Sequence, residues 1–228
     1  MKDKPSLGIY GKVSVRVEDK DGRLLYEKEQ PMESFVLNFS RIVRGLFGSF
    51  ATLTSGTAGA AIYVTNESVL TSVYDISNTK QDIKIVTYIS QSSQTQIGLL
   101  AVNAPANDDT WGIVIGGGST PPAPDNYNLE LKYTHGTGVN QFSYLATSFI
   151  DPTVSGNNIS FSIIRQFTNL YSADQVVRET GIIARWKFAV GYYSYDVKFL
   201  IVRDVLTSPV TVPSGGILTV KYTITVSV

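Results

Sequence analysis

The sequence has no cysteine and one histidine, His135, among its 228 residues. Without thiols, disulfide bonds, thiolate nucleophiles and cysteine-ligated zinc or iron–sulfur centres are excluded. Any metal would have to be held almost wholly by oxygen ligands. We therefore expect no metal and no other cofactor.

The chain also lacks an excess of either charge, with 19 Lys and Arg against 19 Asp and Glu. Proteins that bind nucleic acid or anionic membranes carry a basic surface, so no specific nucleic acid is expected, and membrane contact is not indicated by charge. No window is apolar for eighteen residues, and the polar start Met1–Pro5 predicts that there is no signal peptide.

The sequence also gives little support for a set of catalytic residues. His135 lies in a glycine-rich turn, and no Gly-x-Ser-x-Gly elbow is present. The acidic residues that could form a glycosidase pair all fall in or beside predicted loops: Asp108, Asp109, Asp125, Glu130 and Asp151. We expect a protein that is not an enzyme.

What the chain does contain is typical of β-sheets. Ser and Thr make up about a fifth of it, and Val, Ile and Thr together exceed a quarter. Short strands separated by turn residues are predicted near 69–76, 82–90, 96–102, 111–115, 127–133, 141–149, 158–168, 175–186, 188–193, 196–203 and 217–228. The predicted fold is all-β: an antiparallel β-sandwich or jelly roll with an N-terminal β-hairpin and one short α-helix.

Residues 1–50 are predicted to form an N-terminal docking or oligomerisation region, and residues 51–228 the sandwich. The alternating Val13, Val15 and Val17 before the Asp21-Gly22 turn and the short run Leu24–Glu27 after it predict the hairpin. After Ser34, a plausible N-cap, apolar residues recur at helical spacing and predict a helix over 35–47. Its stripe is a candidate interface with neighbouring subunits: Phe35, Phe39, Ile42 and Leu46.

The uncharged segment 45–66 has two interpretations. One is a membrane-active segment. The other is the end of the helix followed by a packed Gly/Ala loop and a strand at 62–65, which its many Thr residues and its glycines favour.

The segment Gly116–Pro124 is rich in glycine and then in proline, which predicts a flexible hinge followed by an extended stretch. No Gly-Lys-Ser/Thr follows, so it is not a phosphate loop. We include Gly117, Pro121 and Pro122 among the candidate interface residues.

Charged residues interrupt apolar strands in the second half of the chain. If buried, each would need a partner. We therefore predict structural cross-strand ion pairs rather than a ligand site, from Arg165, Arg178, Glu179, Arg203 and Asp204, with Arg185 as a further member. A carbohydrate-binding surface is the alternative function, with Tyr192, Tyr193 and Tyr195 as its aromatic residues.

Several blocks of the sequence resemble β-rich virion structural proteins of tailed phages and of viruses that infect hot-spring archaea. The blocks are Gly11–Val13, Ser34–Phe39, Trp111–Gly118, Asp125-x-Tyr127-x-Leu129, Ser160–Asn169, Val177–Gly181, Arg203–Leu206 and Pro209–Tyr222.

The resemblance implies a non-enzymatic virion structural protein that forms an oligomeric ring or spike at a tail, nozzle, turret or vertex. Its expected partners are copies of itself and other virion proteins, and it would be made in the host cytoplasm and reside in the virion. The alternative is a carbohydrate-binding β-sandwich that attaches the particle to a host-surface glycan.

Overall fold

The structure, a computed structural model, describes residues 8–32, 35–41, 52–54, 63–65, 70–84, 99–190 and 193–227. It is an all-β protein, as predicted, with one short helix at residues 37–41. The strands are β1 (Gly8–Glu18), β2 (Leu24–Pro31), β3 (Thr52–Thr54), β4 (Tyr63–Thr65), β5 (Leu70–Tyr74), β6 (Lys80–Lys84), β7 (Leu99–Ala101), β8 (Gly112–Gly116), β9 (Thr134–His135), β10 (Gln141–Tyr144), β11 (Ser148–Ser155), β12 (Asn158–Thr168), β13 (Gln175–Val190), β14 (Tyr193–Val212) and β15 (Ile217–Ser227).

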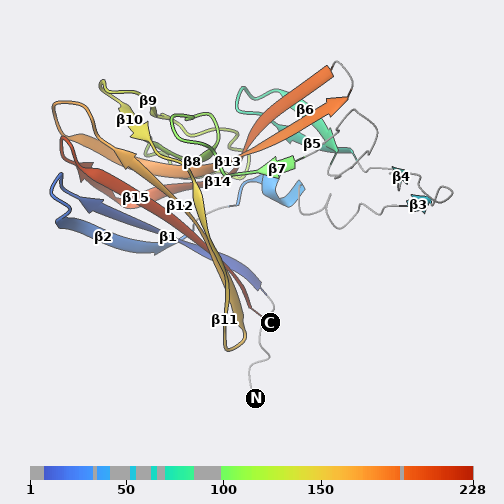
Figure 1. The fold of residues 1–228 in the computed structure, drawn as a ribbon, viewed down its shortest axis with the longest axis horizontal. Coiled ribbons are helices and arrows are strands. Elements are labelled where there is room, and N and C mark those ends of the chain that lie inside the picture. Colours follow the sequence, from blue (N-terminus) through green and yellow to red (C-terminus); the bar gives the residue numbers. More distant parts are fainter. Residues whose placement is uncertain are drawn as a thin grey trace.

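Two larger sheets contain most of the strands (Figure 1). The seven-stranded sheet has the order β2-β1-β15-β12-β10-β9, with β11 also paired to β12. The four-stranded sheet has the order β14-β13-β7, and β8 also pairs with β13. The pairs are antiparallel except for β9 with β10.

The N-terminal hairpin forms as predicted and is part of the large sheet. Gly22 has a φ of 79°, the left-handed conformation that the tight turn between β1 and β2 requires. Strand β1 pairs along its whole length with β15, from Gly8 opposite Ser227 to Glu18 opposite Ile217. The hairpin predicted within residues 1–50 is therefore an edge of the seven-stranded sheet, and β15 completes the hydrogen bonds of β1.

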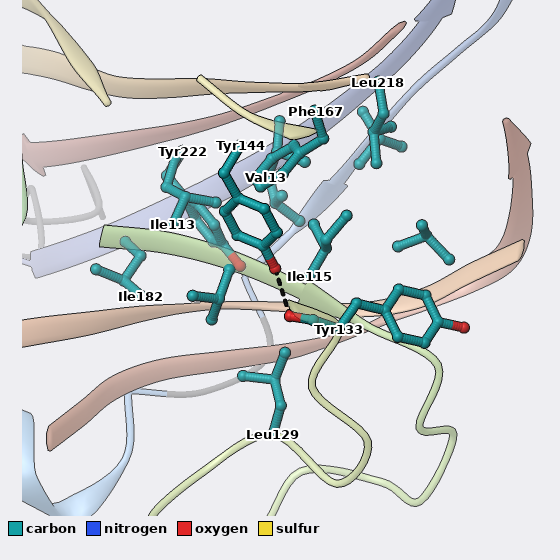
Figure 2. Close-up of a cluster of buried hydrophobic side chains, with 14 of the residues drawn as sticks. Val13, Ile113, Ile115, Leu129, Tyr133, Tyr144, Phe167, Ile182, Leu218 and Tyr222 are labelled. Carbon is teal, nitrogen blue, oxygen red and sulfur yellow. Dashed lines mark hydrogen bonds between the residues drawn. The ribbon is translucent and has the colours of Figure 1, made fainter. Parts of the chain in front are cut away.

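One buried cluster joins the two larger sheets. Alternate residues of β1, β12 and β15 point to the same side, and these side chains pack with residues of β8, β13 and β14 (Figure 2). At its centre, the hydroxyl of Tyr144 donates a 2.7 Å hydrogen bond to the carbonyl of Tyr133. Burial raises the pKa of this phenol far above its usual value.

A smaller cluster covers another part of the four-stranded sheet. Val73 and Ile83, from the β5–β6 hairpin, pack with Ala184, Trp186 and Phe199 of β13 and β14. The four-stranded sheet is therefore covered by the seven-stranded sheet in one place and by a hairpin in another.

The observed strands differ from the predicted ones in four places. The predicted strands at 175–186 and 188–193 are joined in one strand, β13, which runs without a break from Gln175 to Val190, and β14 continues to Val212 instead of ending at 203. The predicted strand at 141–149 is interrupted after Tyr144, and β11 begins at Ser148. Residues 127–133 do not form a strand, because two of their amides bind the carboxylate of Glu179 in place of a sheet partner.

The helix begins later than predicted. Phe35 forms an isolated bridge with Val202, and the amide of Val36 donates to the carbonyl of Ile201 at 3.1 Å. These bonds extend the chain along β14 before the helix begins at Leu37. Residues 42–51 lie outside the described residues, as do 55–62 and 66–69, so most of the predicted helix and of the uncharged segment is not described.

Candidate functional site

Glu179 is a buried acid of the four-stranded sheet whose two carboxylate oxygens both accept hydrogen bonds. Its Oε1 accepts hydrogen bonds from the amides of Gly118 at 3.0 Å and Leu131 at 2.8 Å. Its Oε2 accepts from the amide of Glu130 at 3.1 Å and from Arg203 Nε at 2.9 Å. Because both oxygens are used inside the protein, this carboxylate stabilises the loop over β13 and has little capacity to bind a ligand.

Arg203 extends this network into the same loop. It lies on β14, and its Nη1 donates to Asn126 Oδ1 at 2.9 Å, while its Nη2 lies 3.5 Å from Glu130 Oε2. Hydrogen bonds from Thr120 and Ser119 lower the pKa of Glu130. Of the predicted ion-pair residues, the structure thus brings Glu179 and Arg203 together, and it adds Asn126 and Glu130 from the loop.

The glycines before this loop are tightly packed. A Cβ on Gly116 would lie 2.5 Å from the carbonyl oxygen of Leu131, and one on Gly118 would lie 2.5 Å from Glu179 Oε1. The amide of Gly117 donates to the carbonyl of Leu131 at 2.9 Å. The flexible hinge predicted here is therefore wrong: the glycines are needed for close approach of backbone and carboxylate. Pro121 is exposed and Pro122 is half-buried.

Arg165 lies in the other sheet, away from this network. It is buried on β12, and its guanidinium donates to five backbone carbonyls, which belong to Pro105, Asp108, Trp111, Ile113 and Leu145. It also lies over the ring of Tyr144 at 4.9 Å. In the described part of the chain it makes no ion pair, which corrects the prediction. Carbonyl dipoles and ring faces compensate its charge instead.

The remaining predicted charges are separate from each other. Asp204 is buried on β14 opposite Thr180, close to Tyr222, whose pKa burial raises well above its usual value. Arg178 is half-buried and makes no ion pair with the described residues. Arg185 pairs with Asp196 at 2.7 Å near the surface.

Of the acids and the imidazole considered for catalysis, Asp108, Asp109, Glu130 and His135 are used structurally. Asp109 accepts from the amide of His135 and from Lys132, while Nδ1 of His135 accepts from the amide of Tyr144 at 3.3 Å. Asp108 accepts from Thr110 and from the indole of Trp111. Among the described residues, no three acidic or histidine side chains come close enough to hold a metal ion.

Two hollows share Asn126 and Tyr127 in their linings. The first, of about 470 Å³, is lined by Leu37, Asn38, Arg41, Tyr74, Asn78, Pro124, Asp125, Asn126 and Tyr127. The second, of about 520 Å³, is lined by Ile76, Ser77, Thr120, Pro121, Ala123, Asn126, Tyr127, Asn128, Leu129, Glu130 and Arg203. We call the first hollow the Tyr127 groove.

The other conspicuous surface is the arm, which consists of β11 with residues 158–162 of β12, 223–227 of β15 and 8–12 of β1. It projects away from the rest of the two larger sheets (Figure 1). Strand β11 is exposed along its whole length. On the arm, the seven-stranded sheet continues beyond the region where the four-stranded sheet covers it.

The register shows which side of the arm is apolar. Val13, Tyr222 and Ile163 lie opposite one another in the buried core. Four residues further along each strand, on the same side of the sheet, a second cross-strand row begins. It consists of Ile9, Val226, Ile159 and Val154. Side chains alternate between the two faces of a strand, so this row continues the core-facing side. Ile9 is 53% exposed and Val154 is 75% exposed.

The opposite side of the arm is mostly polar. Ser160 and Thr225 hydrogen-bond at 2.8 Å, and Ser162 and Thr223 at 2.9 Å. The arm therefore has the composition of a sheet with one face in water and one face buried, although nothing in the described part of the chain covers the apolar face.

The candidate interface residues near the helix are partly described. The rings of Phe35 and Phe39 stack at 3.9 Å between centroids, and both side chains are half-buried. Ile42 and Leu46 lie outside the described residues. The same holds for the side chains of Tyr192, Tyr193 and Tyr195.

Comparisons of the chain with protein-family models, with curated proteins and with solved structures found no match. In the described part of the chain, no helix has the length and apolar character needed to cross a bilayer.

Proposed function

We propose that this chain is a non-enzymatic virion structural protein that assembles with copies of itself into a ring or spike at a tail, nozzle, turret or vertex. The apolar face of the arm is the observation that carries the proposal. A row of aliphatic side chains that continues the core-facing side of a sheet, yet remains exposed, needs a covering partner. A copy of the same chain supplies a matching aliphatic sheet face.

We also propose that the two larger sheets form a β-sandwich in which the longer sheet extends past the shorter one. The buried cluster to which both sheets contribute supports this arrangement. In such a subunit the body folds as one core, and the arm is left to pack on a neighbour. Its other partners would be further virion proteins, and its location would be the virion.

The experiment that tests assembly uses the purified full chain in mass photometry and negative-stain electron microscopy. The wild type is expected to form discrete oligomers at micromolar concentration, with ring or spike shapes in micrographs. Replacing Val154 with Asp should shift the population towards monomer, because a carboxylate would have to be desolvated at the interface.

The matched control is Thr153→Asp, which places the same charge on the same strand but on the polar side of the arm. It should leave the oligomer intact. A wild-type chain that is monomeric and fully folded at micromolar concentration would refute the proposal, and so would equal effects of Val154→Asp and Thr153→Asp.

A further inference from the structure

The Tyr127 groove has features that assembly does not require. Its walls come from three separate segments: the helix at residues 37–41, the end of β5 with the turn that follows it, and the loop at 124–127. These segments are joined by hydrogen bonds. Asn38 Nδ2 donates to the carbonyl of Tyr74 at 2.8 Å, and the amide of Leu37 donates to the carbonyl of Pro124 at 2.7 Å.

The floor of the groove is anchored to buried groups. Asn126 Oδ1 accepts from Arg203 Nη1 and from the amide of Ala123, both at 2.9 Å. Arg203 is fixed in turn by Glu179. On the other wall, Asp75 Oδ1 accepts from the amides of Ser77 and Thr79 and so closes the turn that carries Asn78. The groove is therefore formed before any ligand binds, which lowers the entropic cost of binding.

Several side chains in the groove have unused hydrogen-bonding capacity. Asp125, Tyr127 and Asn78 are exposed, and none of their side chains hydrogen-bonds to another described residue. Asn38, by contrast, is used through both its nitrogen and its oxygen in holding the walls, and the oxygen of Asn126 is used in the same way. The groove thus presents a carboxylate, a phenol and an amide to solvent at fixed positions.

Two tyrosine rings accompany these polar groups. Tyr74 is 38% exposed and Tyr127 is 39% exposed, and Arg41 lies over the ring of Tyr74 at 5.2 Å. A ring face next to hydrogen-bonding groups suits a ligand with an apolar C–H face and a rim of hydroxyls.

The charged side chains of the groove decide which classes of ligand fit it. Arg41 is the only cation in the described lining of this groove, and the carboxylate of Asp125 lies in the same lining. A phosphate or another anion would meet that carboxylate, so anions are disfavoured. A purely apolar ligand would leave the carboxylate and the amide without partners. A neutral ligand with several hydroxyl groups can donate hydrogen bonds to Asp125 and accept them from Arg41, so both side chains gain a partner.

We propose that the Tyr127 groove binds a short neutral saccharide, with the apolar face of a sugar ring on Tyr127 and sugar hydroxyls bonded to Asp125 and Arg41. The site differs from the Tyr192–Tyr195 cluster that the sequence indicated. Its existence does not depend on the proposed assembly of the chain.

The experiment is saturation-transfer-difference NMR on the wild-type full chain with glucose, galactose, mannose and N-acetylglucosamine and with their β1-4 disaccharides, each at millimolar concentration. At least one sugar is expected to receive saturation on the C–H groups of a single ring face. Tyr127→Ala and Asp125→Asn should each weaken binding about tenfold, which corresponds to the loss of one well-placed contact. Tyr127→Phe should retain most of the binding because it keeps the ring.

Tyr10→Ala is the matched control, since Tyr10 is an exposed tyrosine on the arm and does not line the groove. Thermal unfolding of each variant checks that the fold is kept, and Asp125→Ala replaces Tyr127→Ala if the latter is unstable. Absence of binding by every sugar of the panel would overturn the proposal. Binding that survives both Tyr127→Ala and Asp125→Asn would overturn it as well.

Discussion

Nε of Arg203 lies 2.9 Å from Oε2 of Glu179, where strands β14 and β13 run side by side and both side chains are buried. Each partner also binds the loop that follows β8, so a single ion pair connects two strands and a loop. A charge pair in this position fixes which strand and which loop meet, because an incorrect pairing would leave a charge buried without a partner.

Removing the charge of Glu179 should therefore be strongly destabilising. Glu179→Gln keeps the size of the side chain, but it replaces an acceptor oxygen with an amide that faces donors. We expect a loss of about 3–5 kcal/mol in the free energy of unfolding, measured by guanidinium denaturation. The control is Lys12→Gln, which breaks an exposed pair with Glu29 and should cost no more than about 1 kcal/mol. Equal losses in the two variants would contradict this role.

Arg165 should tolerate even a conservative change poorly. Lysine has three donors on a flexible stem and cannot reach the five carbonyls that the planar guanidinium binds. Arg165→Lys is expected to lower the free energy of unfolding by about 3 kcal/mol, with urea denaturation as the measurement. Arg23→Lys, in the exposed turn of the hairpin, serves as the reference and should be nearly neutral. A loss below about 1 kcal/mol for Arg165→Lys would show that the carbonyls do not depend on it.

Asp108 should contribute a pH-dependent part of the stability. Burial alone raises its pKa, but hydrogen bonds from Thr110 and from the indole of Trp111 outweigh burial and hold it below the usual 3.8. The folded state thus binds the proton less tightly than the unfolded state. The stabilisation is fully present above the unfolded pKa and is lost as the pH falls through the folded pKa.

Asp108→Asn tests this linkage. The variant should be less stable than the wild type at about pH 7, and the difference should shrink at about pH 3, where the Asp108 carboxyl of the unfolded wild-type chain becomes protonated. Chemical denaturation at the two pH values measures it. A difference that stays constant or grows towards acid pH would have the wrong sign.

Gly181 is a sensitive test of packing between β13 and β14. A Cβ at this position would lie 2.6 Å from the carbonyl oxygen of Val202 and 2.8 Å from a methyl group of Leu129. Because a backbone oxygen cannot move aside easily, Gly181→Ala should cost about 1–3 kcal/mol by overpacking, as read from the midpoint of denaturant unfolding.

Gly22→Ala provides the comparison, since its Cβ would meet nothing within 4 Å, and only the left-handed φ of 79° opposes it. A penalty of about 1 kcal/mol is expected there. The packing at Gly181 would be less tight than described if its variant proved the more stable of the two.

Several elements could be predicted from the sequence because their causes are local. The alternation of Val13, Val15 and Val17 and the Asp21-Gly22 turn predicted the hairpin, and the alternation from Val220 to Val226 predicted β15. The loop at 127–133 could not be predicted, because its backbone donors are satisfied by Glu179, nearly fifty residues away. The sequence indicated only one part of the Tyr127 groove, the block Asp125-x-Tyr127. Arg41 and Tyr74 lie far from this block in the sequence, and the fold brings them into the same lining.

The sequence by itself determined the all-β class, the hairpin turn and the apolar side of the main strands, since a period of two and the chemistry of a turn act within a few residues. Only the tertiary structure decided which charges are paired and which apolar residues stay exposed. Arg165 binds carbonyls and Arg203 binds Glu179 because of which segments the sheets bring together. Ile9 and Val154 follow the same alternation as the core valines, yet they are uncovered because the four-stranded sheet ends before the arm begins.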